Sequence, residues 1–131
     1  MPWELNARPA DGGNGLGTLE QVQSQLQRAV PDVVFFREQS GAEKLAALKE
    51  QGVTVPPAVA AVWKAAASSY RGIIEGVGVT IELNFGTRAE SVEQILIDVR
   101  GDGDLRREVQ PLLNIPNWRL TDAQGEVQAK T

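Results

Sequence analysis

The stretch that decides the fold is Val79-Thr80-Ile81-Glu82-Leu83-Asn84-Phe85, in which apolar and polar side chains alternate strictly. Successive side chains of a β-strand point to opposite faces of a sheet, so this alternation predicts a strand with one face in the core and one in water. Strands buried on only one face are typical of antiparallel sheets. Residues 92–99 repeat the pattern after a hairpin-length connection, and we expect them to pair back on this strand.

Outward from this hairpin, the rest of the chain divides into further strands and helices. Strands are also predicted at 2–8, 33–36, 72–75 and 118–122. Helices are predicted to start after Thr18 and Ser40, at Pro56, and after Asp104. The order is then strand, helix, strand, two helices, three strands, helix, strand. This order predicts an α+β fold with a mostly antiparallel sheet and helices packed on one face, ferredoxin-like in part.

Several local signals sharpen these expectations. Thr18 with Gln21 and Ser40 with Glu43 have the spacing of capping boxes. The continuous apolar run at 33–36 predicts a buried strand. The helix that starts at Pro56 has an apolar stripe, which consists of Val59, Val62, Trp63, Ala66 and Tyr70. Pro111 is expected to kink or shorten the last helix, because its ring clashes with the preceding turn.

Composition sets limits on function. The 131 residues, with no linker or repeat, predict a single domain over 1–131. The chain has 17 acidic and 13 basic residues but neither histidine nor cysteine. It therefore has no thiolate, disulfide or zinc–sulfur site and no Ser-His-Asp triad. An enzyme is less expected than a binding protein, and no cofactor is predicted.

The charge pattern disfavours some partners. Arg106-Arg107 is the only adjacent basic pair, so binding to nucleic acid is not expected. No apolar run approaches the ~20 residues of a membrane helix, and no secretion signal is recognised at the N-terminus. We therefore expect no membrane partner and a cytoplasmic location. A homodimer through an exposed edge strand is one expected assembly.

A glycine-rich loop before the first helix is a candidate phosphate site. It combines Gly12, Gly13, Gly15, Gly17 and Thr18, and its Gly-x-x-x-x-Gly frame before Thr18 resembles a P-loop. The lysine that should follow the last glycine is absent, and the dinucleotide-binding pattern does not fit. A surface loop is the alternative interpretation.

The polar turn at 100–104 is a candidate metal site. Asp98, Asp102 and Asp104 supply oxygen ligands of the kind that Ca²⁺ and Mg²⁺ prefer. The EF-hand pattern fails because Arg106 stands where a third ligand belongs. The alternative is a glycine-rich turn in which Asp104 caps the last helix.

A candidate interaction surface lies on the outward face of the two central strands. Glu82, Asn84, Asp98 and Arg100 are expected to meet there across the hairpin. Paired carboxylates on such a face can support acid–base catalysis, but a solvated sheet face explains them as well. A protein partner covering this face is the third interpretation.

The C-terminal half is similar to a group of small uncharacterised bacterial proteins. The similarity rests on residues 79–86, on the turn 99–104, and on Trp118-Arg119 with Asp122 and Gly125-Glu126. The group shows an "IEFNFG" strand, an "RGxGD" turn and a "GWR…D…GE" ending, and this chain departs from it at Asn117. The resemblance implies a shared fold and no established activity.

Three functional hypotheses follow. The first is a non-enzymatic protein-interaction module of the bacterial cytoplasm, of the immunity or accessory type. The second is a small-molecule or phosphate-binding domain that uses the loop at 12–17. The third is a carboxylate- or metal-dependent enzyme built on Asp98, Asp102 and Asp104.

Overall fold

The computed structural model describes residues 3–10, 12–13, 15–37, 40–65 and 69–127. In this part of the chain, seven strands form one antiparallel sheet in the order β2-β3-β4-β5-β1-β6-β7. The strands are β1 (Trp3–Pro9), β2 (Val34–Arg37), β3 (Tyr70–Glu75), β4 (Val79–Gly86), β5 (Ile95–Gly101), β6 (Trp118–Asp122) and β7 (Gly125–Glu126). The helices are α1 (Leu19–Ala29), α2 (Gly41–Glu50), α3 (Pro57–Ala65) and α4 (Leu105–Leu113). The predicted α+β class and element order are confirmed.

The centre of the sheet has a ferredoxin-like arrangement. Strands β4, β5, β1 and β6 are neighbours in that order, and α1 and α4 follow β1 and β5 in the chain. Four antiparallel strands in this order, with two crossover helices, make up the ferredoxin-like motif. The segment from β2 to β3, with α2 and α3 between them, is inserted after α1 and extends the sheet at one edge.

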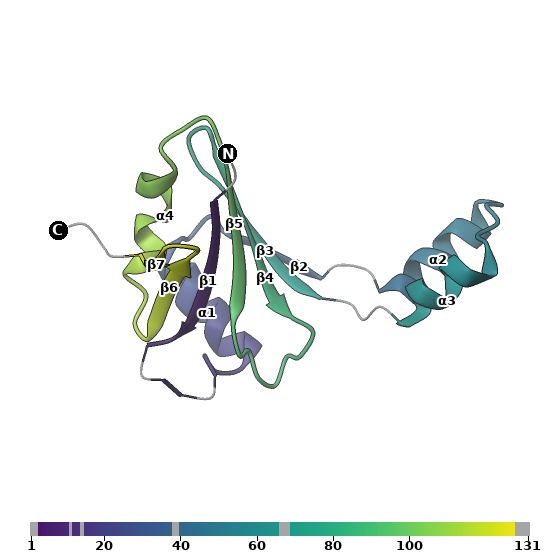
Figure 1. Cartoon of the computed structure of the whole chain (residues 1–131), viewed down its shortest axis with the longest axis horizontal. Helices are drawn as coiled ribbons and strands as arrows, with labels where there is room; N and C mark the ends of the chain where they lie inside the picture. The colour runs from purple at the N-terminus through teal and green to yellow at the C-terminus, as the bar shows by residue number, and fades with distance from the viewer. Residues whose placement is uncertain (1–2, 11, 14, 38–39, 66–68, 128–131) are drawn as a thin grey trace.

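The core lies between the sheet and the helices α1 and α4. The inward side chains of β4 alternate with outward ones, as predicted, and Ile81 and Leu83 are each about 1% exposed. From the helices, Val22, Leu26 and Val109 are fully buried against them. Figure 1 shows α1 running along the back of the sheet. Of the described helices, α1 and α4 cover one face of the sheet, and none covers the other.

Helices α2 and α3 form a separate pair, which we call the arm (residues 40–65). Figure 1 shows the arm extending away from the sheet beyond the ends of β2 and β3. The two helices are in close contact, because a Cβ atom added to Gly41 would lie 1.6 Å from the carbonyl oxygen of Trp63. The predicted stripe of the third helix is interrupted: Val62 is 70% exposed, and Tyr70 belongs to β3.

The prediction that the run at 33–36 is buried was only half right. Val33 is buried, and the ring of Phe35 lies 6.0 Å from that of Phe85, centroid to centroid. Val34 and Phe36 are 57% and 47% exposed. Val34 and Phe36 point to the face of the sheet that α1 and α4 do not cover, so these side chains meet water despite their apolar character.

The helix starts agree with the predicted caps. Thr18 accepts a hydrogen bond from the Gln21 amide, and the Gln21 side chain accepts one from the Thr18 amide. At the start of α2, the Ser40 hydroxyl accepts a hydrogen bond from the Glu43 amide. The Glu43 carboxylate accepts two hydrogen bonds from the Arg37 guanidinium. Asp104 caps α4 by accepting from the Arg107 amide at 3.2 Å. Helix α4 runs through Pro111 and ends at Leu113, so the proline lies inside the helix.

Candidate functional site

The uncovered side of the sheet, which we call the open face, carries a regular array of outward side chains. Every second residue of the central strands points to it, while its neighbours are in the core. The members are Glu4, Asn6 and Arg8 of β1, Leu96, Asp98 and Arg100 of β5, Thr80, Glu82 and Asn84 of β4, Arg71, Ile73 and Glu75 of β3, Val34 and Phe36 of β2, and Arg119 and Thr121 of β6.

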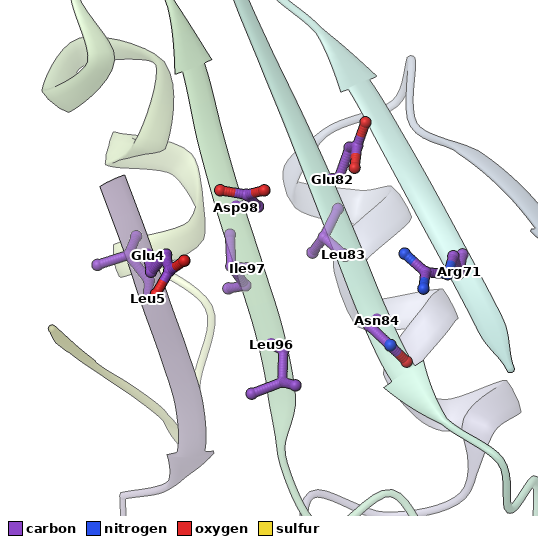
Figure 2. Close-up of a pocket in the computed structure, with 9 residues that line it drawn as sticks. All are labelled: Glu4, Leu5, Arg71, Glu82, Leu83, Asn84, Leu96, Ile97 and Asp98. Carbon is purple, nitrogen blue, oxygen red and sulfur yellow. The ribbon is translucent and has the colours of Figure 1, made fainter. Parts of the chain in front are cut away.

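Three carboxylates form a row across the middle of the open face. Asp98 lies directly opposite Glu4 of β1 on one side and Glu82 of β4 on the other. Figure 2 shows the three side chains on adjacent strands, on the same side of the sheet. Directly opposed residues have Cβ atoms about 4.5–5.5 Å apart, and like charges at that spacing destabilise a sheet. The row is therefore a cost to the fold unless positive charge meets it.

Arg100 offsets part of this negative charge. Its guanidinium donates a hydrogen bond to Oδ2 of Asp98. This bond, followed by attraction to the charges of Asp98, Glu82 and Glu4, raises the pKa of Arg100 above its ordinary value. The other oxygen of Asp98, Oδ1, is buried and has no hydrogen-bond partner among the described residues. Such an acceptor costs about 1–3 kcal/mol when it stays unmet.

A shallow groove of about 290 Å³ runs beside the carboxylate row. One side of it is apolar, because Leu96 is 52% exposed on the open face. Its outward side chains are Glu4, Arg71, Glu82, Asn84, Leu96 and Asp98. A groove with several oxygen acceptors next to an exposed aliphatic side chain suits a ligand that combines positive charge with apolar groups.

The structure brings the predicted surface residues together. Glu82, Asn84, Asp98 and Arg100 all lie on the open face, and Glu82 is directly opposite Asp98 as expected. The Asn84 amide oxygen is engaged by the Gly86 amide at 2.9 Å. Sequence reasoning missed Glu4 and Arg71, which come from β1 and β3. The outward position of Glu4 in the predicted first strand was the available signal.

The glycine-rich loop is fixed by bonds within the protein. The amide of Leu16 donates to Val92, that of Thr18 to the Gln21 side chain and that of Leu19 to Ala89. A Cβ atom on Gly17, which has a φ of +119°, would lie 2.6 Å from the Gln21 side-chain oxygen. Gly12 and Gly13 border a hollow on the β1–β6 side. A phosphate would need free amide donors in this loop, but the amides of Leu16, Thr18 and Leu19 already donate to acceptors within the protein.

The three candidate metal ligands occupy different local settings. Asp98 is in the carboxylate row of β5 and bonded to Arg100, Asp102 is exposed in the following turn, and Asp104 caps α4. Among the described residues, no group of three or more acidic side chains is placed to hold a metal ion. The capping role predicted for Asp104 is confirmed.

Comparisons with known proteins leave the site to be judged on its own geometry. No protein-family model matches the chain, and no curated protein or solved structure is significantly similar to it. None of the helices in the described part of the chain has the length and apolar character that crossing a membrane requires.

Proposed function

We propose that this protein is a non-enzymatic interaction module that binds another polypeptide through its open face. The observation that carries the proposal is the row of directly opposed carboxylates Glu4, Asp98 and Glu82 on a sheet face that no helix covers. A bound Lys or Arg side chain would remove the like-charge repulsion of the row and donate hydrogen bonds to its exposed carboxylates.

Exposed apolar side chains support a protein partner over a small cation. Leu96, Phe36 and Val34 are each about half exposed on the open face. Apolar side chains surrounded by charged ones are typical of protein–protein interfaces. A polypeptide with both aliphatic and basic side chains would cover the groove and neutralise the row together.

The setting of this function is part of the proposal. The resemblance of residues 79–86, 99–104 and 118–126 to small bacterial proteins supports a bacterial, cytoplasmic protein of the immunity or accessory type. A gene for a toxin beside the gene for this chain would support the immunity type, and a conserved neighbourhood of metabolic enzymes would contradict it.

A capture experiment with charge-reversed baits tests the binding role. The wild-type chain, the double variant E4K/E82K and the matched control E20K/E93K are immobilised and exposed to lysate of the native host. Glu20 and Glu93 are exposed and lie outside the open face. Because the control also replaces two Glu by Lys, it changes the net charge by the same amount at a different surface. We expect a specific protein on the wild-type and control baits and its loss from E4K/E82K.

The captured protein is then purified and titrated against the three baits. Removing charge pairs from an interface of this kind should weaken binding at least about tenfold. If E4K/E82K binds the partner as tightly as the wild type, or if all three baits recover only the same background, the open face is not the binding surface.

A further inference from the structure

The arm is a helix pair without a core of its own. Helices α2 and α3 have ten and nine residues. Of the described arm side chains, only the position of Gly41 is buried, while Val59 and Val62 are 40% and 70% exposed. Isolated helices shorter than about 12–15 residues are marginal in water, and most helices depend on packing of an apolar face. Contact between α2 and α3 leaves Leu45, Leu48 and Trp63 only partly buried, so the arm would gain stability from a further surface that covers its apolar side chains.

The open face of the same molecule also exposes apolar side chains that no described element covers. It is the side of the sheet that α1 and α4 leave uncovered, and it exposes Leu96, Phe36 and Val34. A helical layer packed on a sheet face is one of the stable ways to bury apolar side chains that the face exposes. An apolar helix pair and an uncovered apolar sheet face are complementary in kind.

Charge favours the open face over a second arm as the surface for the arm. The segment 40–65 has three lysines, Lys44, Lys49 and Lys64, and two glutamates. Glu43 is bonded to Arg37, and Lys44 is likewise engaged within the chain. The exposed Lys49 and Lys64 therefore outnumber the remaining glutamate, Glu50. Packing arm against arm would bring lysines toward lysines. Packing the arm on the open face would bring lysines toward the carboxylate row.

We propose that the arm of each molecule packs on the open face of a second copy of the same chain, so that two molecules exchange arms about a two-fold axis. The arm leaves the sheet after Arg37 and returns at Ser69, and it extends sideways beyond the ends of β2 and β3 instead of lying over its own open face (Figure 1). A second copy is thus the molecule that presents a reachable face. A reciprocal arrangement of this kind is isologous and closed.

The inference rests on the proposed function, because it names the polypeptide that occupies the same open face. It accounts for three features with one contact: the exposed side chains of the arm, the uncovered side chains of the sheet, and the carboxylate row. It also gives the insertion between β2 and β3 a role in assembly.

Complementary charge reversal tests the exchange. The face variant is E4K/E82K and the arm variant is K49E/K64E; all four side chains are exposed, so both variants should fold. We expect the wild type to sediment as a dimer and each variant alone to be a monomer at the same concentration. An equimolar mixture of the two variants should sediment as a dimer again, because the reversed arm then meets the reversed face and the native arm meets the native face.

The control and the overturning results are distinct. E20K/E93K should remain a dimer, and circular dichroism should show that all variants are folded. A monomeric wild type up to its solubility limit overturns the inference, as does a face variant that stays dimeric alone, which would indicate arm–arm or edge-strand pairing. Variants that are monomeric alone but do not form a dimer when mixed also overturn it.

The failure of the inference is separable from that of the proposed function. If the wild type is a monomer but captures a host protein that E4K/E82K does not bind, the open face is a binding surface with a different occupant. If E4K/E82K matches the wild type in both sedimentation and capture, the proposed function falls as well.

Discussion

At the scale of single residues, Trp3 and Asp122 join the two ends of the chain. The indole Nε1 of Trp3 donates to the Asp122 carboxylate at 3.0 Å, across 119 positions of sequence. The backbone amide of Gln124 donates to the same carboxylate at 2.8 Å. These bonds, the one from Trp3 first, hold the pKa of Asp122 below its ordinary value of 3.8.

We predict that Trp3→Phe makes the stability of the protein less dependent on acid. A carboxylate whose pKa is lower in the folded state stabilises the fold above its unfolded pKa, and that contribution disappears as pH falls through the folded pKa. The free energy of unfolding of the wild type should therefore fall more steeply between about pH 5 and pH 2 than that of the variant. Urea denaturation across this pH range measures both slopes.

The variant Asp122→Asn provides the control for this pair. It should give a shallow slope like that of Trp3→Phe, and the double variant should be no shallower than Asp122→Asn alone. Identical slopes for the wild type and Trp3→Phe would mean that the indole does not set the pKa of Asp122. The partner of Trp3 could not be predicted from sequence, because it depends on the pairing of β1 with β6 and not on any local pattern.

At the scale of elements, Gly41 sets how closely α2 and α3 can approach. In an exposed helix, Gly→Ala is expected to stabilise by up to about 1 kcal/mol. Here an added Cβ would lie 1.6 Å from the Trp63 carbonyl oxygen and 2.4 Å from its carbon, which are backbone atoms that cannot rotate away. The steric term therefore outweighs helix propensity.

We predict that Gly41→Ala loosens the arm without unfolding the sheet. Overpacking of this kind costs about 1–3 kcal/mol, and only the contact between α2 and α3 bears it. Amide hydrogen exchange should show faster exchange throughout 41–65 and unchanged protection of β4 and β5. Ala46→Ser, at an exposed position of the same helix, should leave both regions unchanged; unaltered arm protection in Gly41→Ala would contradict the close helix contact.

The elements also show what sequence can and cannot predict. The caps at Thr18, Ser40 and Asp104 were predictable, because each depends on residues within one turn. The alternation at 79–85 predicted β4 and its two faces for the same reason. The exposure of Val34 and Phe36 was not predictable, since it depends on which face of the sheet the helices cover.

At the scale of the whole molecule, the core and the arm are separate. Every described side chain of the hydrophobic core lies outside the segment 38–68, on the sheet strands, α1, α4 and the loops that join them. The apolar stripe at Val59, Val62 and Trp63 predicted a helix with one face packed against another surface. Periodicity alone does not identify that surface. The outward positions of Glu82 and Asp98 were likewise predictable, whereas the third carboxylate, Glu4, required the pairing of β1 with β5.

This separation predicts that the sheet folds without the arm. Arg37 and Tyr70 are directly opposite in the β2–β3 pair, so an Asn-Gly turn can replace residues 38–69 and close a tight hairpin. The deletion removes no described residue of the core, and we expect cooperative thermal unfolding within about 5 °C of the full-length monomer. The monomeric K49E/K64E variant is the proper reference, because it compares molecules in the same state of assembly.

Calorimetry and sedimentation of the deletion variant then separate folding from assembly. A single cooperative transition together with a monomer would show that the arm serves association and not the stability of the domain. Loss of the cooperative transition would instead show that the arm stabilises its own sheet. Folding of the sheet would then depend on residues outside the hydrophobic core. The face that receives the arm is intact in the deletion variant. If Glu4 and Glu82 of the deletion variant are also changed to Lys, that molecule should bind the acidic arm of K49E/K64E when the two are mixed.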